Sequence, residues 1–214
     1  LKQQNKLVAG DKVSAEETIA AKKKDVIVIG GGDTGSDCIG TSNRQGAQSI
    51  YQIELMEKPP NARAEDNPWP EYAQIFRVYF SQAEGCERAW ALLTKEFIGD
   101  GEDNLKGIKV LDIEWNGFKL AVLPETEHII PCQLALLAIG YIHPQHQGML
   151  EHMGLQLNDN GTVSDKDYQT SVDHVFVAGD MRRGQSLVVW AIREGRQAAQ
   201  AVDEFLMGHS SLPR

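Results

Sequence analysis

The chain has 214 residues, a length typical of one large domain or two small ones. Its 21 Lys and Arg residues against 30 Asp and Glu residues give a formal net charge of −9. This charge argues against a surface for nucleic acid or for an anionic membrane, since both need clustered cations. With 42% hydrophobic and 24% charged residues, the composition is that of a globular protein with a sizeable core.

Two further observations narrow the class of protein. The sequence has no apolar run of the roughly 18–20 residues that a membrane span needs, and its polar start does not resemble a signal peptide. Cys38, Cys86 and Cys132 are far apart and form no C-x-x-C pair. We therefore expect a protein of a reducing compartment, the cytoplasm, with no metal or iron–sulfur site within the chain.

The first expected unit is a β–α–β crossover that follows a polar, lysine-rich segment. Capping-box spacing at the end of that segment predicts a short helix over residues 15–22. A continuous β-branched run then predicts a buried strand at 25–29, followed by a helix at 34–46 and a second strand at 49–56. The whole is the size of one parallel crossover.

The rest of the chain is predicted to be more irregular. Prolines at four positions between 59 and 70 block regular structure there. Later β-like runs are expected at 89–98, 107–115, 118–123, 133–139 and 174–178. A long helix is expected over 185–207 and ends at Gly208. Its expected apolar face consists of Leu187, Ala191, Gly195, Ala198, Val202 and Leu206.

Three glycines with the spacing G-x-G-x-x-G stand directly after the first expected strand. In this context Gly30 permits the tight turn, Gly32 lets the backbone approach a pyrophosphate, and Gly35 lets the helix pack close to the strand. Free N–H groups and the helix dipole stabilise the phosphate charge. The alternative is a glycine turn in an ordinary α/β unit. The candidate cofactor-binding residues here are Gly30, Gly31, Gly32, Asp33, Thr34, Gly35 and Ser36.

The end of the second expected strand bears on which nucleotide binds. An acidic residue about 20 positions after the first glycine binds the ribose of NADH, and Glu54 meets this rule. Lys58 and Arg63 follow closely and are candidates to hold the 2′-phosphate of NADPH, with a solvated loop as the alternative. The sequence predicts a pyridine nucleotide and leaves NADPH or NADH open.

Three stretches of the chain carry a family resemblance: residues 28–47, then Arg63–Pro70, then Val177–Ile192, which includes Gly-Asp-Met-Arg-Arg-Gly-Gln-Ser. In this order they resemble the small (beta) subunit of glutamate synthase. The similarity covers residues 1–208. It implies a flavoprotein in which NADPH or NADH gives a hydride to FAD. Electrons then pass through iron–sulfur clusters to the large (alpha) subunit, where 2-oxoglutarate and glutamine yield glutamate.

The resemblance also implies the fold: an α/β, Rossmann-like, three-layer dinucleotide-binding domain inserted into a second, here incomplete, FAD/NAD(P)-binding domain. Residues 1–24 would connect from the flavin domain, 25–135 would form the NAD(P)H-binding domain, and 136–214 would form the C-terminal part of the FAD-binding domain. No side chain is needed as a catalytic nucleophile or base, because hydride transfer is the chemistry of the cofactors.

The second candidate site lies at the start of the last expected helix. An Asp at a strand's carboxyl end is well placed to accept a hydrogen bond from a ribityl hydroxyl, and the helix N-terminus polarises the flavin. The candidate residues are Gly179, Asp180, Gln185, Ser186, Leu187 and Val188. For Asp180 the alternative is a helix cap. Gly140 would let backbone approach the nicotinamide, or simply end a strand. Arg182 and Arg183 would bind flavin phosphate or a partner subunit, with a solvated loop as the alternative.

Where the chain departs from the family, it lacks a first glycine fingerprint for FAD and a cysteine-rich region. We therefore expect a fragment that binds NAD(P)H, is inactive alone, holds no FAD and leaves the iron–sulfur clusters outside. An exposed apolar face would favour a homodimer of this fragment. Two other functions remain open: a non-catalytic dinucleotide-binding module, and a related flavin-dependent NAD(P)H oxidoreductase with another acceptor.

Overall fold

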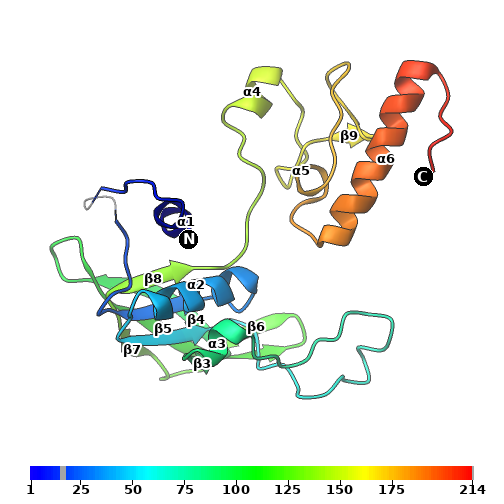
Figure 1. The fold of residues 1–214 in the computed structure, drawn as a ribbon. Coiled ribbons are helices and arrows are strands. Elements are labelled where there is room, and N and C mark those ends of the chain that lie inside the picture. Colours follow the sequence, from blue (N-terminus) through cyan, green and yellow to red (C-terminus); the bar gives the residue numbers. More distant parts are fainter. Residues whose placement is uncertain (15–17, 214) are drawn as a thin grey trace. The chain divides into compact units, whose positions relative to one another are not determined.

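The structure is a computed structural model that describes residues 1–14 and 18–213 (Figure 1). The chain divides into two compact units, Leu1–Gly140 and Tyr141–Arg214, which are described separately. Each unit has its own cluster of buried hydrophobic side chains.

The first unit is built on a parallel sheet with the strand order β3-β2-β1-β8. Its strands are β1 (Asp25–Ile29), β2 (Ser49–Ile53), β3 (Glu87–Ala89) and β8 (Leu134–Leu137). β1 pairs in parallel with both β2 and β8, and the helix α2 (Asp33–Arg44) connects β1 to β2. The expected crossover and the Rossmann-like α/β class are confirmed.

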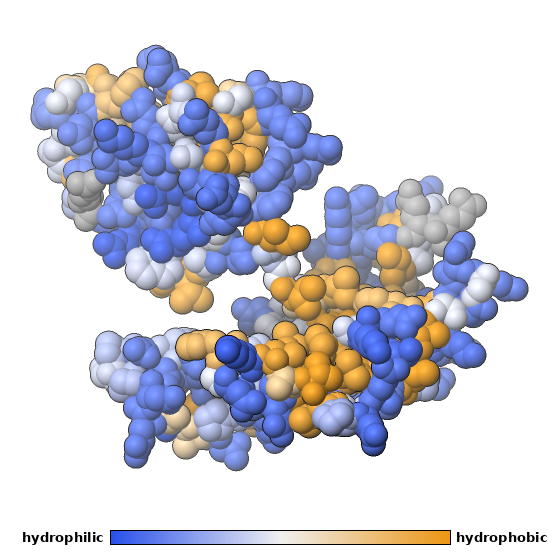
Figure 2. Space-filling view, turned by 180° about the vertical axis from the view of Figure 1, so that it is seen from behind, coloured by the Kyte–Doolittle hydropathy of each residue, from blue (hydrophilic) through white to orange (hydrophobic). Residues whose placement is uncertain are grey.

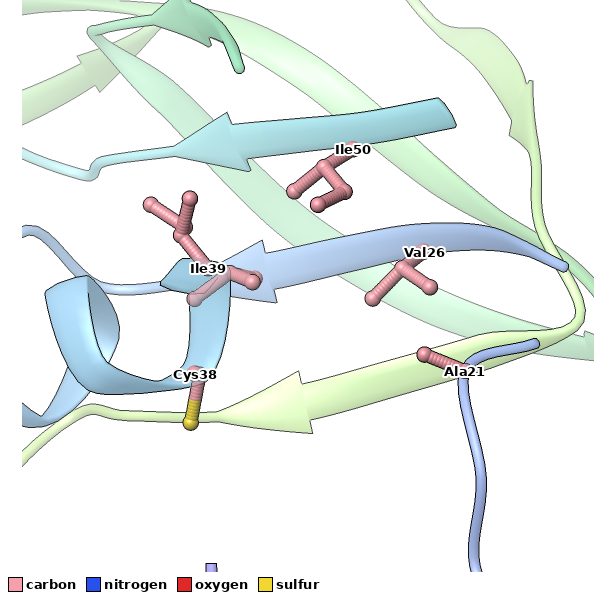
Figure 3. Close-up of a cluster of buried hydrophobic side chains, with 6 residues drawn as sticks. Ala21, Val26, Cys38, Ile39 and Ile50 are labelled. Carbon is pink, nitrogen blue, oxygen red and sulfur yellow. The ribbon is translucent and has the colours of Figure 1, made fainter. Parts of the chain in front are cut away.

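β1 is covered on both faces, which explains its continuous apolar run. Successive side chains of a strand point to opposite faces. Val26 and Val28 therefore pack with Ile39 and Cys38 of α2 and Ile50 of β2, as Figure 3 shows for the residues labelled there. Ile27 points the other way, into a cluster with Ile53, Leu92, Ile108, Val110 and Cys132.

That second cluster joins the parallel sheet to an antiparallel sheet. Its strands are β4 (Leu92–Gly99), β5 (Leu105–Asn116), β6 (Lys119–Val122) and β7 (His128–Pro131). β5 pairs with all three others. The runs expected at 89–98, 107–115 and 118–123 correspond to β4, β5 and β6. β7 was not predicted, because four residues that end in a proline carry too little pattern of their own.

Short elements complete the first unit: α1 (Lys2–Val8) and α3 (Phe80–Ala83). Of the helix expected at 15–22, residues 15–17 lie outside the described residues, and residues 18–22 are not helical. α1 carries no apolar stripe and buries none of its residues, so periodicity did not predict it. Residues 54–79, all of them described, form neither helix nor strand, which agrees with the prolines between 59 and 70; the second strand, expected to reach residue 56, ends at Ile53.

The second unit is small and rich in turns. It contains α4 (Met149–Met153), β9 (Asp165–Lys166), β10 (Gln169–Thr170), α5 (Asp180–Arg183) and α6 (Val188–Met207). Leu150, Val163 and Val177 form its core. The strand expected at 174–178 is wrong. This extended run makes a single bridge, Phe176 with Gln169, and a strand needs a ladder of paired backbone groups.

α6 confirms the expected long helix, although it begins at Val188 and not at residue 185. Gly208 ends it in the left-handed conformation, with φ +76°. The expected apolar face is not a core face within the described residues: Ala198 and Val202 are half-buried and the other members are exposed. The buried residue of α6 is Glu194, which is 1% exposed.

Three further observations bear on function. Among the described residues, no helix combines the length and apolar character needed to cross a membrane. Within the same residues, no group of three or more His, Cys, Asp or Glu side chains is placed to hold a metal ion. On the face of the first unit seen in Figure 2, hydrophobic side chains gather into a patch.

Candidate functional site

The glycine loop, residues 30–35, lies at the carboxyl end of β1 and leads into α2. Gly32 is the N-cap of α2, and its φ of −79° and ψ of −172° are open to any residue. The following N–H groups at the helix start have no intrahelical acceptor, so they are available to a ligand. The strand-to-helix context that the fingerprint requires is therefore present.

The three fingerprint glycines differ in what surrounds them. At Gly30, φ is +119° and an added Cβ would lie 2.2 Å from the carbonyl oxygen of Ala138, just after β8. At Gly35, an added Cβ would lie 2.4 Å from the carbonyl oxygen of Gly30. At Gly32, no atom of the described residues outside its immediate neighbours lies within 4 Å of such a Cβ. Two glycines are thus required by packing, and the third faces open space.

A buried glutamine of β2 binds the glycine loop by a hydrogen bond. Gln52 of β2 is fully buried and donates from Nε2 to the carbonyl oxygen of Gly30, at 2.9 Å. Its Oε1 accepts from Nε2 of Gln82 at 3.0 Å, and Oε1 of Gln82 accepts from the backbone N–H of Tyr79. This chain of hydrogen bonds fixes the turn at Gly30 to β2 and α3.

Glu54 lies against the loop. An added Cβ at Gly31 would lie 2.0 Å from Oε2 of Glu54, so the carboxylate occupies the space that a side chain there would take. Nη2 of Arg88, on β3, donates to Oε1 of Glu54 at 3.2 Å. Arg88 also donates from Nη1 to the carbonyl oxygen of Arg77 and lies over the rings of Phe76 and Trp90.

The two cations expected near the ribose differ in their surroundings, and Lys58 lies over the same rings, Phe76 and Trp90, as Arg88. Nζ of Lys58 is 4.7 Å from the centroid of the Phe76 ring. Arg63 donates from Nη1 to the carbonyl oxygens of Asn67, at 2.8 Å, and Glu71, at 3.0 Å. Arg63 therefore makes contacts with its own loop, whereas Lys58 contacts aromatic rings beside Arg88.

The remaining candidates of the first unit lie on the loop or beside it. Asp33 and Thr34 are exposed and Ser36 is buried at the start of α2. Gly140 ends the segment after β8 with φ +88°, and no other described residue comes within 4 Å of a Cβ built there. The Ala138 N–H donates to the carbonyl oxygen of Ile29, which keeps this segment beside the glycine loop.

In the second unit, the candidate residues surround the start of α5 and α6. Gly179, with φ +70°, is the N-cap of α5, so Asp180 follows the cap and does not form it. The Asp180 carboxylate is exposed. Gln185 donates from Nε2 to the carbonyl oxygen of Tyr141 at 2.7 Å. Ser186, Leu187 and Val188 are exposed at the start of α6. An open pocket of about 380 Å³ is lined by residues that include Tyr141, Asp180 and Gln185.

A buried carboxylate organises this second group. Glu194 accepts from the Gly179 N–H at 2.9 Å, from Nη1 of Arg182 at 3.2 Å and from Nε of Arg183 at 2.7 Å. Nε of Arg182 also lies 2.9 Å from Oδ1 of Asp165. Both arginines therefore have carboxylate partners within their own unit, and they fix the turn at Gly179.

The comparisons with known proteins agree with this geometry. A family model described as pyridine nucleotide-disulphide oxidoreductase matches residues 2–195. The chain belongs to this family. The solved structure of thioredoxin reductase from T. acidophilum matches 87% of the chain and 54% of that structure's chain, with a TM-score of 0.59 and 22% identity. This likeness supports the fold of the oxidoreductase chain.

Curated relatives are more similar in sequence. The glutamate synthase [NADPH] small chain of Mycobacterium tuberculosis is 44% identical over 213 residues, which cover 98% of this chain and 43% of that relative. Glutamate synthase [NADH] of Schizosaccharomyces pombe is 44% identical over 209 residues, which cover 91% of this chain and 10% of the relative. The resemblance to glutamate synthase small chains is confirmed. This oxidoreductase chain spans less than half the length of these relatives.

Three residues of the oxidoreductase chain were missed by sequence reasoning: Gln52, Arg88 and Glu194. Gln52 had a signal, because it is a polar residue inside the apolar run of β2. Arg88 stands in the three-residue strand β3, which pairs with β2, and Glu194 lies among mostly exposed helix residues. Their roles depend on tertiary contacts that no local pattern reveals.

Proposed function

We propose that this chain is the electron-input part of a glutamate synthase small subunit. Its first unit binds NAD(P)H at the glycine loop. In the intact subunit the hydride passes to FAD, for the reductive synthesis of glutamate from 2-oxoglutarate and glutamine. The proposal also includes a large-subunit partner, which the names of the relatives suggest, and a cytoplasmic location, which three free cysteines support.

One observation carries the nucleotide proposal: Gly32 faces open space while Gly30 and Gly35 face backbone. If the loop served packing alone, protein atoms would lie close to the Cα of all three glycines. The open position and the free N–H groups at the start of α2 fit a pyrophosphate that approaches the backbone closely. The residues proposed to hold the nucleotide are Gly30, Gly31, Gly32, Asp33, Thr34, Gly35, Ser36 and Glu54.

The protein's part in hydride transfer is binding and orientation. α2 directs its N–H groups toward the pyrophosphate, Glu54 meets the ribose, and Gly140 lets the chain pass close to the nicotinamide. When bound, FAD supplies the ability to take up a hydride and to release electrons singly. Lys58 and Arg63 are proposed as candidates to hold the 2′-phosphate of NADPH; Lys58 lies over rings that Arg88 also contacts, and Arg63 binds carbonyl oxygens of its own loop.

The second unit fits one part of a flavin site. Gly179 has open space beside its Cα, Asp180 presents an exposed carboxylate that accepts a long hydrogen bond from the Ser186 hydroxyl at 3.5 Å, and α6 begins at Val188. We propose that Gly179, Asp180, Gln185, Ser186, Leu187 and Val188 contact FAD in the intact subunit. Residues 1–214 hold one glycine fingerprint, and the nucleotide is proposed to use it. The chain alone is therefore proposed to purify without flavin, and a stoichiometric flavin absorbance would contradict this.

The proposed domains follow from these two sites. Residues 25–135 form the NAD(P)H-binding domain, and residues 1–24 and 136–214 belong to the FAD-binding domain, with iron–sulfur clusters outside the chain.

We also propose a homodimer of the chain. Leu187, Val188, Val189 and Ile192 are exposed at the start of α6, at 59–72% of their full accessible surface, and a second copy would cover them.

Amide NMR spectra of the chain test the nucleotide site directly. Addition of NADH or NADPH should shift the amide signals of residues 30–36 and 54 and leave those of residues 150–210 in place. Shifts that lie in the second unit, or at the antiparallel sheet of the first, would contradict the proposed site. If NADH or NADPH binds but the intact subunit, supplied with FAD, transfers no hydride from it, the alternative of a non-catalytic dinucleotide-binding module is favoured.

A further inference from the structure

The first peptide of the glycine loop, between Gly30 and Gly31, is held in one orientation by β2. A glycine leaves this peptide free to turn, so either its carbonyl group or its N–H group can face a ligand. The Gly30 carbonyl oxygen accepts from Nε2 of Gln52 at 2.9 Å. The Gly30 N–H donates to the carbonyl oxygen of Ile53, also at 2.9 Å. Both backbone groups of Gly30 are therefore bound to β2.

The hydrogen bond from Gln52 decides where the next N–H group points. The Gly30–Gly31 peptide is trans, so its carbonyl group and its N–H group point in opposite directions. Because the carbonyl faces Gln52, the Gly31 N–H faces away from Gln52. Among the residues that the structure describes, none accepts a hydrogen bond from this N–H. It is therefore available to an anion, together with the N–H groups at the start of α2.

Gly35, the last glycine of the fingerprint, makes room for the same hydrogen bond. A Cβ added at Gly35 would lie 2.4 Å from the Gly30 carbonyl oxygen and 3.5 Å from Nε2 of Gln52. A side chain at position 35 would therefore push the carbonyl group away from its donor. The buried amide and the glycine maintain one orientation of the peptide.

The direction of the hydrogen-bond chain is fixed at both of its ends. The Tyr79 N–H can only donate, and Oε1 of Gln82 accepts from it at 3.0 Å. Nε2 of Gln82 then donates to Oε1 of Gln52 at 3.0 Å, which leaves Nε2 of Gln52 to donate to Gly30. The exposed fractions of Gln52 and Gln82 are 0% and 5%, so water competes little for these bonds.

We propose that Gln52 and Gln82 are positioning residues that turn the Gly31 N–H toward the pyrophosphate of the nucleotide. Gln52 acts through Gly30, Gln82 acts through Gln52, and neither contacts the nucleotide. A released Gly30 peptide is free to rotate, and its carbonyl oxygen, which carries partial negative charge, would then repel the phosphates. The inference rests on the proposed nucleotide site and adds the residues that organise it.

The test is a set of fluorescence titrations, with NADH and with NADPH, on the 214-residue chain and on two variants. Gln52→Leu removes the donor to Gly30. Gln82→Leu removes the donor that orients Gln52, at a residue without a hydrogen bond to the glycine loop. For whichever nucleotide binds more tightly, the dissociation constant should rise at least roughly tenfold in Gln52→Leu and at least roughly threefold in Gln82→Leu.

Gln48→Leu is the matched control, because it makes the same substitution at an exposed position just before β2. It should leave the dissociation constant within about twofold of the wild-type value. Circular dichroism checks that each variant is folded. If Gln52→Leu does not fold, the decision passes to Gln82→Leu and to the Gly31 amide signal of the wild-type chain.

Amide NMR separates positioning from a general loss of stability. When nucleotide saturates the wild-type chain, the Gly31 amide signal should move downfield, and the signal of Gly30, which donates to Ile53, should move far less. In both variants the Gly31 shift should be smaller even at saturating nucleotide. Lower stability alone would not change the shift of the folded, saturated chain.

Three results would count against these roles in different ways. A Gly31 signal that stays in place in the saturated wild-type chain would overturn the inference and leave the nucleotide site intact. An unchanged dissociation constant in a folded variant would overturn the role of the residue that it replaces. A wild-type chain that binds neither nucleotide would overturn the proposed function itself.

Discussion

At Gly30 and Gly35 a methyl group would meet backbone atoms, whereas at Gly32 it would meet open space. Gly30→Ala should therefore lower the free energy of unfolding by more than about 2 kcal/mol, because both its positive φ and the Ala138 carbonyl oppose a side chain. Gly32→Ala should change it by less than about 1 kcal/mol. Urea unfolding of the two variants measures the difference, and equal effects would contradict the assignment of their roles.

Gln52 is the buried residue that connects the glycine loop to the rest of the first unit. Gln52→Leu keeps the size of the side chain but leaves the Gly30 carbonyl oxygen and the Gln82 amide without their partner. We expect a loss of about 1–3 kcal/mol in the free energy of unfolding. The exposed Gln48→Leu, just before β2, is the control and should change stability by less than about 0.5 kcal/mol. Equal losses in both would show that the hydrogen bonds contribute nothing.

The three thiols should react slowly with disulfide reagents in the folded chain. Burial raises the pKa of the Cys38 and Cys86 thiols, and burial together with the charge of Asp25 raises the pKa of Cys132 from 9.0 to about 11. At pH 8 only about 0.1% of Cys132 would be thiolate, the reactive form. Ellman's reagent should therefore label the native chain much more slowly than the urea-unfolded one.

The same shift predicts how stability depends on pH. A folded-state pKa above the unfolded value means that the protonated thiol stabilises the fold, and this contribution is complete below pH 9.0. It is lost as the pH rises toward about 11. Cys132→Ala should weaken this loss in urea unfolding at alkaline pH. An unchanged pH profile in the variant would contradict the assignment to Cys132.

At the scale of elements, Glu194 shows how the turn before α6 is held. Glu194→Ala removes the acceptor for the Gly179 N–H and leaves Arg182 and Arg183 without this partner. We expect a loss of about 2–4 kcal/mol in the unfolding of the second unit. Glu204→Ala, at an exposed position of the same helix, should change it by less than about 0.5 kcal/mol. A comparable loss in both variants would contradict the role of Glu194.

Elements with a strong period of their own could be predicted from the sequence. β1, α2 and α6 carry continuous or helical patterns, and the structure contains all three. The strand expected at 174–178 is wrong and β7 was missed, because a short run becomes a strand only when a partner pairs with it. The glycine loop was predicted as a site, but the partner of Glu54 was not, since Arg88 lies 34 residues later on another strand.

At the scale of the whole molecule, the two units have separate cores and are proposed to have separate duties. Self-association through the start of α6 would belong to the second unit alone. Val188→Lys and Ile192→Lys should therefore abolish concentration-dependent dimer formation in sedimentation velocity and leave nucleotide binding unchanged. A monomeric wild-type chain, or a dimer that survives both substitutions, would contradict the proposed homodimer.

The account depends most on nucleotide binding at the glycine loop. Calorimetric titration of NADH and of NADPH into the chain, and into Gly32→Ala, tests it most directly. We expect one nucleotide to bind per wild-type chain, with a much weaker affinity in Gly32→Ala although that variant unfolds at the same urea concentration. Failure of both nucleotides to bind the wild-type chain at millimolar concentration, or unchanged binding in Gly32→Ala, would contradict the account.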